Sequence, residues 1–198
     1  MKTFIICVAG LLVHVASAAL QCEIIRIKTC AQRYKVAVKD GKNHCERLQT
    51  MIDCLAQDFS CADITITSFR FWMLQMGLMD KIMGNCPDLE TDDLRTFTTK
   101  ILNKRPDLVV DSVDMDSSSP CARKIHNRCV EYYVKTLKRT RQICTAVQAL
   151  NLCYSKGIVD DNCQADIIEH FADILQKVAP RVINILKNNL PKVCEDWV

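Results

Sequence analysis

A repeated cysteine spacing is the feature that most constrains how this chain can fold. Residues 22–54 and residues 121–153 each hold four cysteines separated by steps of 8, 15 and 9 residues, with a constant offset of 99 residues. Two further cysteines follow each set, and three coinciding steps indicate an internal duplication. The two sets are Cys22, Cys30, Cys45, Cys54, Cys61 and Cys86, and Cys121, Cys129, Cys144, Cys153, Cys163 and Cys194.

The N-terminus has the three parts of a secretory signal peptide. Lys2 supplies a positive charge, residues 4–15 are almost wholly apolar, and residues 16–18 read Ala-Ser-Ala. This pattern predicts cleavage after Ala18, which removes one of the 13 cysteines and leaves an even number. An even number of cysteines in an exported chain is typical of complete disulfide pairing in an oxidising compartment. We therefore expect a secreted protein with no transmembrane segment.

Apolar residues recur at helical spacing after each first cysteine. The pattern predicts helices over 22–39 and 44–55, and again over 121–138 and 143–154, with a tight turn inside each pair. A third amphipathic stretch follows each hairpin, at 63–84 and at 165–190. The alternating β-branched residues at 64–67 leave a short extended piece as an alternative. Pro180 is expected to kink or break the last helix.

The predicted fold class is all-α, with two tandem disulfide-stapled domains, each a helical hairpin plus a third helix. The signal peptide occupies 1–18 and the first cysteine-rich repeat 19–105, which includes an extra helix ending before Pro106. Residues 106–120 are acidic and serine-rich and form a linker, and the second repeat occupies 121–198.

The hairpins also predict which cysteines pair. When the two helices of a hairpin lie antiparallel on either side of its turn, a cysteine of the first helix comes opposite a cysteine further along the chain. The Cα–Cα distance between two such cysteines can then match that of a disulfide. The cysteines that face away from the hairpin seam are assigned by elimination, although six cysteines allow about 15 connectivities. The expected pairs are Cys22–Cys61, Cys30–Cys54, Cys45–Cys86, Cys121–Cys163, Cys129–Cys153 and Cys144–Cys194.

Motifs for catalysis, metal binding and phosphate binding are absent from the sequence. His44, His126 and His170 stand in no metal-ligand spacing, and each is more readily explained as a surface histidine. The net charge of +3 is too small for a nucleic-acid-binding domain. We therefore expect no catalytic residue, no metal and no cofactor.

Two groups of residues are candidates for binding. A basic face on residues 121–141 would suit an anionic partner, although an ordinary solvated helix face explains it as well. A methionine-rich stripe on residues 69–83 would suit an apolar partner, although core packing explains it as well. The basic face is Arg123, Lys124, Arg128, Lys135, Lys138, Arg139 and Arg141, and the apolar face is Phe69, Trp72, Met73, Met76, Met79 and Met83.

These observations predict a secreted, non-enzymatic protein that binds an extracellular protein or membrane receptor, of the toxin-like kind found in secretions or venoms. Two copies of one scaffold offer two contact surfaces, which raises avidity when both engage. The alternative is an extracellular carrier that holds small apolar ligands between its amphipathic helices. A secreted enzyme with an unrecognised site is the third interpretation.

Overall fold

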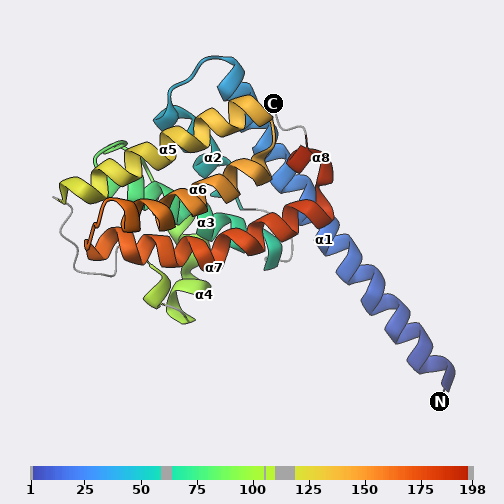
Figure 1. Ribbon diagram of the computed structural model, residues 1–198. Helices are drawn as coiled ribbons and strands as arrows, with labels where there is room; N and C mark the ends of the chain where they lie inside the picture. Colours follow the sequence, from blue (N-terminus) through green and yellow to red (C-terminus); the bar gives the residue numbers. More distant parts are fainter. Residues whose placement is uncertain (1, 59–63, 105, 110–118, 196–198) are drawn as a thin grey trace.

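Helices make up all of the regular secondary structure that the computed structural model describes (Figure 1). The described residues are 2–58, 64–104, 106–109 and 119–195, with side chains from residue 21 onward except at 64, 65, 108 and 193. In this part of the chain no helix is both long and apolar enough to cross a membrane. The all-α prediction is confirmed.

The first hairpin consists of α1 (Lys2–Lys39) and α2 (His44–Leu55). Gly41 has a φ of 72°, a left-handed conformation that glycine adopts without strain, and it ends α1. Asn43 then begins α2 through a capping box, in which its side chain accepts from the backbone N–H of Glu46 and the Glu46 carboxylate accepts from the backbone N–H of Asn43. The N-terminal part of α1 projects away from the other helices (Figure 1).

The second hairpin consists of α5 (Pro120–Thr140) and α6 (Ile143–Asp160), joined by a two-residue turn. Ser119 caps α5, and Pro120 occupies the first turn, where its missing N–H is not needed. Arg141 takes the left-handed conformation, with a φ of 56°, and ends the helix.

The third helices are α3 (Ile64–Ile82) and α7 (Asp166–Asn189). The sequence allowed a short extended segment at 64–67 as an alternative to helix. The structure shows that α3 is helical from Ile64, because the burial of this helix outweighs the modest helix propensity of β-branched residues. The prediction of a break at Pro180 is wrong, since α7 continues through it. The extra helix is α4 (Asp92–Lys104), followed by the 3₁₀ turn η1 (Pro106–Leu108), and α8 (Pro191–Glu195) is the last helix described.

Five disulfides brace these helices, and they coincide with five of the six pairs expected from the spacing. Their Cα–Cα distances lie between 5.0 and 5.8 Å. Cys22 is also disulfide-bonded, but its expected partner Cys61 lies outside the described residues. The five pairs are Cys30–Cys54, Cys45–Cys86, Cys121–Cys163, Cys129–Cys153 and Cys144–Cys194.

One hydrophobic core runs through both halves of the chain. α3 packs against α1, α2 and α4 of its own half and also against α7 of the other half. From the segment expected to be a linker, Val109 is buried, and its carbonyl lies 3.3 Å from His170 Nε2 on α7. The two halves therefore share one core, while their origin by duplication and their boundaries as domains stay predictions.

Gly77 lets α3 approach its neighbours closely. A Cβ at this position would lie 3.0 Å from Ile52 Cδ1, 3.0 Å from Leu89 Cδ2 and 3.2 Å from Thr91 Cγ2, all in buried residues. We expect Gly77→Ala to lower the free energy of unfolding by about 1–2 kcal/mol, because overpacking outweighs a gain in helix propensity of about 1 kcal/mol. Urea unfolding measures this, and a stabilised variant would show that the three neighbours can yield.

Candidate functional site: a pocket between the hairpins

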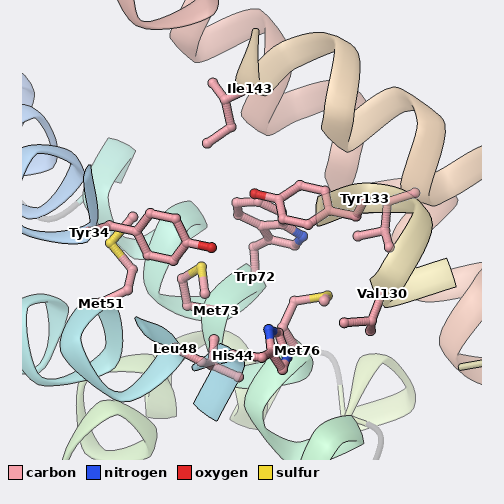
Figure 2. Close-up of a pocket in the computed structure, with 11 residues that line it drawn as sticks. Tyr34, His44, Leu48, Met51, Trp72, Met73, Met76, Val130, Tyr133 and Ile143 are labelled. Carbon is pink, nitrogen blue, oxygen red and sulfur yellow. The ribbon is translucent and has the colours of Figure 1, made fainter. Parts of the chain in front are cut away.

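A mostly apolar pocket lies where the two hairpins meet on α3 (Figure 2). Its cavity volume is about 40 Å³. Each of α1, α2, α3, α5 and α6 contributes to the wall, so residues far apart in the sequence meet here. The lining residues are Tyr34, His44, Leu48, Met51, Trp72, Met73, Met76, Val130, Tyr133, Ile143 and Leu150.

Equivalent positions of the two cysteine repeats line the pocket in pairs. Tyr34 and Tyr133 are separated by the 99-residue offset of the cysteines, and so are Met51 and Leu150. Figure 2 shows the two tyrosine hydroxyl groups pointing toward each other, on the side of the pocket where Trp72 and Met73 lie. The pocket is therefore built from corresponding faces of the two hairpins.

Three buried nitrogen atoms at this site have no hydrogen-bond partner among the described residues. They are Nε1 of Trp72, Nδ1 of His44 and Nε of Arg47, which lies on α2 beside the pocket. A buried polar atom without a partner destabilises a fold by about 1–3 kcal/mol. Trp72 and His44 line the pocket, whereas Arg47 does not.

Both tyrosines keep their protons at neutral pH. Burial raises the pKa of Tyr34, against the opposing charge of Arg47, and the charge of Asp80 adds to the rise. Burial also raises the pKa of Tyr133, and the neighbouring Tyr34 adds to the rise while Arg47 again opposes it. Each tyrosine hydroxyl group is therefore protonated at neutral pH.

A buried carboxylate holds His44 in place at the edge of the pocket. Asp80 Oδ2 lies 3.0 Å from His44 Nε2, and Asp80 Oδ1 lies 2.9 Å from Nε2 of His126. Asp80 and His126 are fully buried. Burial raises the pKa of Asp80, but the hydrogen bonds of His126 and His44 outweigh it and hold that pKa well below its usual range. Asp80 is therefore ionised and only accepts, so Nε2 of each histidine donates to it.

The network continues from α5 into α6. His126 Nδ1 lies 2.6 Å from the hydroxyl of Tyr154, whose pKa is raised well above its usual value by burial and by the charge of Asp80. The Tyr154 ring packs edge-on against Phe171 of α7, at 5.1 Å between ring centroids. The network therefore joins α2 and α3 of the first half to α5 and α6 of the second.

The residues around Asp80 do not provide a metal site in the oxidised protein. Ligand atoms of His44, Asp80 and Cys86 lie within 4.8 Å of one another. Cys86 is bonded to Cys45, however, and a metal takes a cysteine as its thiolate. His44 Nε2 is also occupied by Asp80.

The structure buries all six residues of the expected apolar face. Trp72, Met73 and Met76 line the pocket, whereas Phe69, Met79 and Met83 pack in the core. The middle of the stripe therefore borders a cavity, and its two ends pack in the core. Sequence periodicity alone gives no means of separating the two groups.

All seven residues of the expected basic face are exposed. Lys124 and Arg128 both pair with Asp161, and Lys135 pairs with Glu131 one turn away in α5. The other four form no ion pair with any described residue, and three of them lie at the end of α5. These four are Arg123, Lys138, Arg139 and Arg141.

The expectation that the histidines are surface residues is wrong for His126, which is fully buried. Its role depends on Asp80, which is 46 residues away in sequence and belongs to the other repeat. No spacing signal connects the two residues. An aspartate within the apolar stripe of α3 was the one hint in the sequence, because an ionised residue at such a position needs partners.

Comparison with family models, with curated proteins and with solved structures finds no match for this chain. The function is therefore argued from the chemistry of the described residues.

The Asp80 network makes stability depend on acidity. The pKa of Asp80 is depressed by folding, so its contribution is present above its usual value of 3.8 and is lost as the pH falls from there toward the lower pKa of the folded state. We expect Asp80→Asn to lower the free energy of unfolding at pH 7 by about 3 kcal/mol, because two histidine donors lose their buried carboxylate. We also expect the variant to lose less further stability in acid than the parent protein does.

Guanidinium unfolding at pH 7 and at pH 3 measures both effects. Asp88→Asn is the matched control, since Asp88 is exposed and its side chain forms no hydrogen bond or ion pair with the described residues. Parallel acid profiles for the parent protein and Asp80→Asn would show that Asp80 carries no such linkage.

Proposed function

We propose that the mature chain is a secreted, non-enzymatic carrier of a small apolar ligand, which occupies the pocket between the hairpins. The observation that carries this proposal is an apolar cavity whose wall includes the Trp72 N–H, which has no hydrogen-bond partner within the described part of the chain. Ligand sites in proteins are typically apolar cavities with a few polar groups that orient the ligand.

Export is supported by the signal-like N-terminus and by the disulfides. Cleavage after Ala18 would remove residues from the part of α1 that projects from the other helices (Figure 1). The remaining part of α1 still packs on α2 and α3, and Cys30 still joins it to Cys54. Disulfides of this kind persist in oxidising compartments.

A non-enzymatic role is supported by the side chains that line the pocket. None of the described lining residues is Ser, Thr, Cys or Lys, the usual nucleophiles of covalent catalysis. His44 is oriented by Asp80 as a general base would be, but no serine, threonine or cysteine lies among the described lining residues for it to activate. The pocket is suited to holding a molecule rather than transforming it.

The wall of the pocket is able to adapt. The cavity of about 40 Å³ has room for about three water molecules, at about 10–15 Å³ each. Met51, Met73 and Met76 line it, and methionine side chains repack easily around a bound molecule. A ligand of several carbon atoms is thus admitted when these side chains move aside.

We expect 1-octanol, a small neutral apolar probe, to bind in the pocket and to change the fluorescence of Trp72. The chain has two tryptophans, so Trp197→Phe makes Trp72 the single reporter. Val130→Phe, which fills the pocket wall, should abolish the response while the protein remains folded. The measurement is a fluorescence titration of the oxidised mature protein.

Val36→Phe is the control for that substitution, because Val36 is exposed on α1 and lies outside the pocket. It should leave the titration unchanged. The absence of any response to 1-octanol in the parent protein would exclude the carrier function.

Binding to an extracellular protein or receptor is the second candidate, and the outer face of the second hairpin favours it. Leu152 is 68% exposed and Val159 is 76% exposed on α6, and Tyr132 on α5 is half-exposed. Tyr132 and Leu152 line an open groove that also holds Arg128 and Lys156. Exposed apolar residues rimmed by charged ones are typical of protein contact surfaces.

We expect Leu152→Asp to change the free energy of unfolding by no more than about 0.5 kcal/mol, as surface substitutions usually do. If this face binds a receptor, the substitution should remove saturable binding of the labelled mature protein to responsive cells. Val36→Asp on α1 is the matched control and should leave binding intact. Equal binding by both variants would exclude this face as the contact.

A further inference from the structure

Two residues that line the pocket each have a buried nitrogen atom without a hydrogen-bond partner among the described residues. The two atoms are Nε1 of Trp72, on α3, and Nδ1 of His44, the first residue of α2. In Figure 2 the Met76 side chain lies between the Trp72 indole and the His44 imidazole. Displacement of Met76, the movement that admits a ligand, therefore opens both nitrogen atoms to that ligand.

The two nitrogen atoms have opposite hydrogen-bonding roles. The indole nitrogen of Trp72 donates and does not accept. His44 Nε2 lies 3.0 Å from Oδ2 of the ionised Asp80 and donates to it, so the neutral imidazole has its lone pair on Nδ1. The wall of the pocket therefore offers one donor and one acceptor.

The charges around the pocket favour a neutral ligand. None of the described lining residues is Lys, Arg, Asp or Glu, so an ionic group in the cavity would have no counter-ion on the wall apart from a protonated His44. The ionised Asp80 lies directly behind the His44 ring and would repel a carboxylate there. An ammonium group only donates, and it would leave the Trp72 N–H without an acceptor.

We propose that the ligand is a small, neutral, apolar molecule with one hydroxyl group, whose oxygen accepts from the Trp72 N–H and whose O–H donates to His44 Nδ1. This inference rests on the proposed carrier function, because it names the chemical class of the ligand in the same pocket. A hydroxyl group donates and accepts through a single oxygen, which suits a cavity of about 40 Å³. The apolar part of the ligand packs against Met51, Val130 and Leu150.

A ligand that only accepts hydrogen bonds is the relevant alternative. A ketone oxygen would accept from Trp72 but would leave His44 Nδ1 buried without a partner, which is unfavourable. The molecules 1-octanol and 2-octanone have the same number of carbon atoms and one oxygen each. A comparison of the two therefore isolates the hydroxyl proton, and octanoate adds a test of charge.

The test is calorimetric titration of the oxidised mature protein with these three probes at pH 8, where an ordinary imidazole is neutral. We expect 1-octanol to bind the parent protein at least about fivefold more tightly than 2-octanone, the difference that one hydrogen bond makes. Octanoate should bind more weakly than either neutral probe, because its charge is buried without a counter-ion.

Substitution of each polar residue should give a different pattern. His44→Gln keeps an N–H that can donate to Asp80 but removes Nδ1, so it should abolish the preference for 1-octanol and change the affinity for 2-octanone less than about twofold. Trp72→Phe removes the indole N–H, so it should weaken both neutral probes by a similar factor of about three or more and keep the preference. His170→Gln is the matched control, since His170 lies on α7 outside the pocket and should affect neither probe.

The outcomes separate this inference from the carrier function. Equal affinity of the parent protein for 1-octanol and 2-octanone, or tighter binding of octanoate, would overturn the hydroxyl assignment and leave the carrier function standing. Failure of all three probes to bind would overturn the carrier function as well. The comparison in the parent protein decides the assignment even if His44→Gln does not fold.

Discussion

The ionised carboxylate of Asp80 is the interaction on which the arrangement of the two halves depends. It lies on α3, accepts from His44 of its own half and from His126 of the other, and is fully buried. A buried carboxylate without donors would be very unfavourable, so the two halves have to meet at this point with both histidines in place. Polar pairing of this kind fixes how the helices are positioned, whereas hydrophobic packing alone tolerates several arrangements.

The pocket follows from that arrangement. A disulfide between cysteines 24 residues apart braces each hairpin, so the tyrosine of each hairpin lies at the same position relative to its own disulfide. Asp80 then holds His44 at the edge of the space between the hairpins. The result is a cavity bordered by rigid, covalently braced helices on two sides and by adaptable methionines on α2 and α3.

The polar atoms of the site fall into two groups with different physical roles. His126 forms hydrogen bonds with both Asp80 and Tyr154, so these residues stabilise the contact between the two halves. Trp72, Arg47 and His44 each have a buried nitrogen without a partner among the described residues, and an unsatisfied buried nitrogen makes a fold less stable. Trp72 and His44 are the two of these residues that line the cavity, so they are the polar groups that a molecule in the pocket would meet.

The helical class, the hairpins and the five described disulfide pairs could be predicted from the residues alone, because helical periodicity and pairing across a turn depend on residues close together in the chain. The sequence also indicated that the stripe on α3 was either core or contact surface. The packing of the helices in space placed three of its residues at a cavity and buried His126 against Asp80. These contacts join the two repeats across long stretches of chain, and no local periodicity encodes which faces of two hairpins will meet.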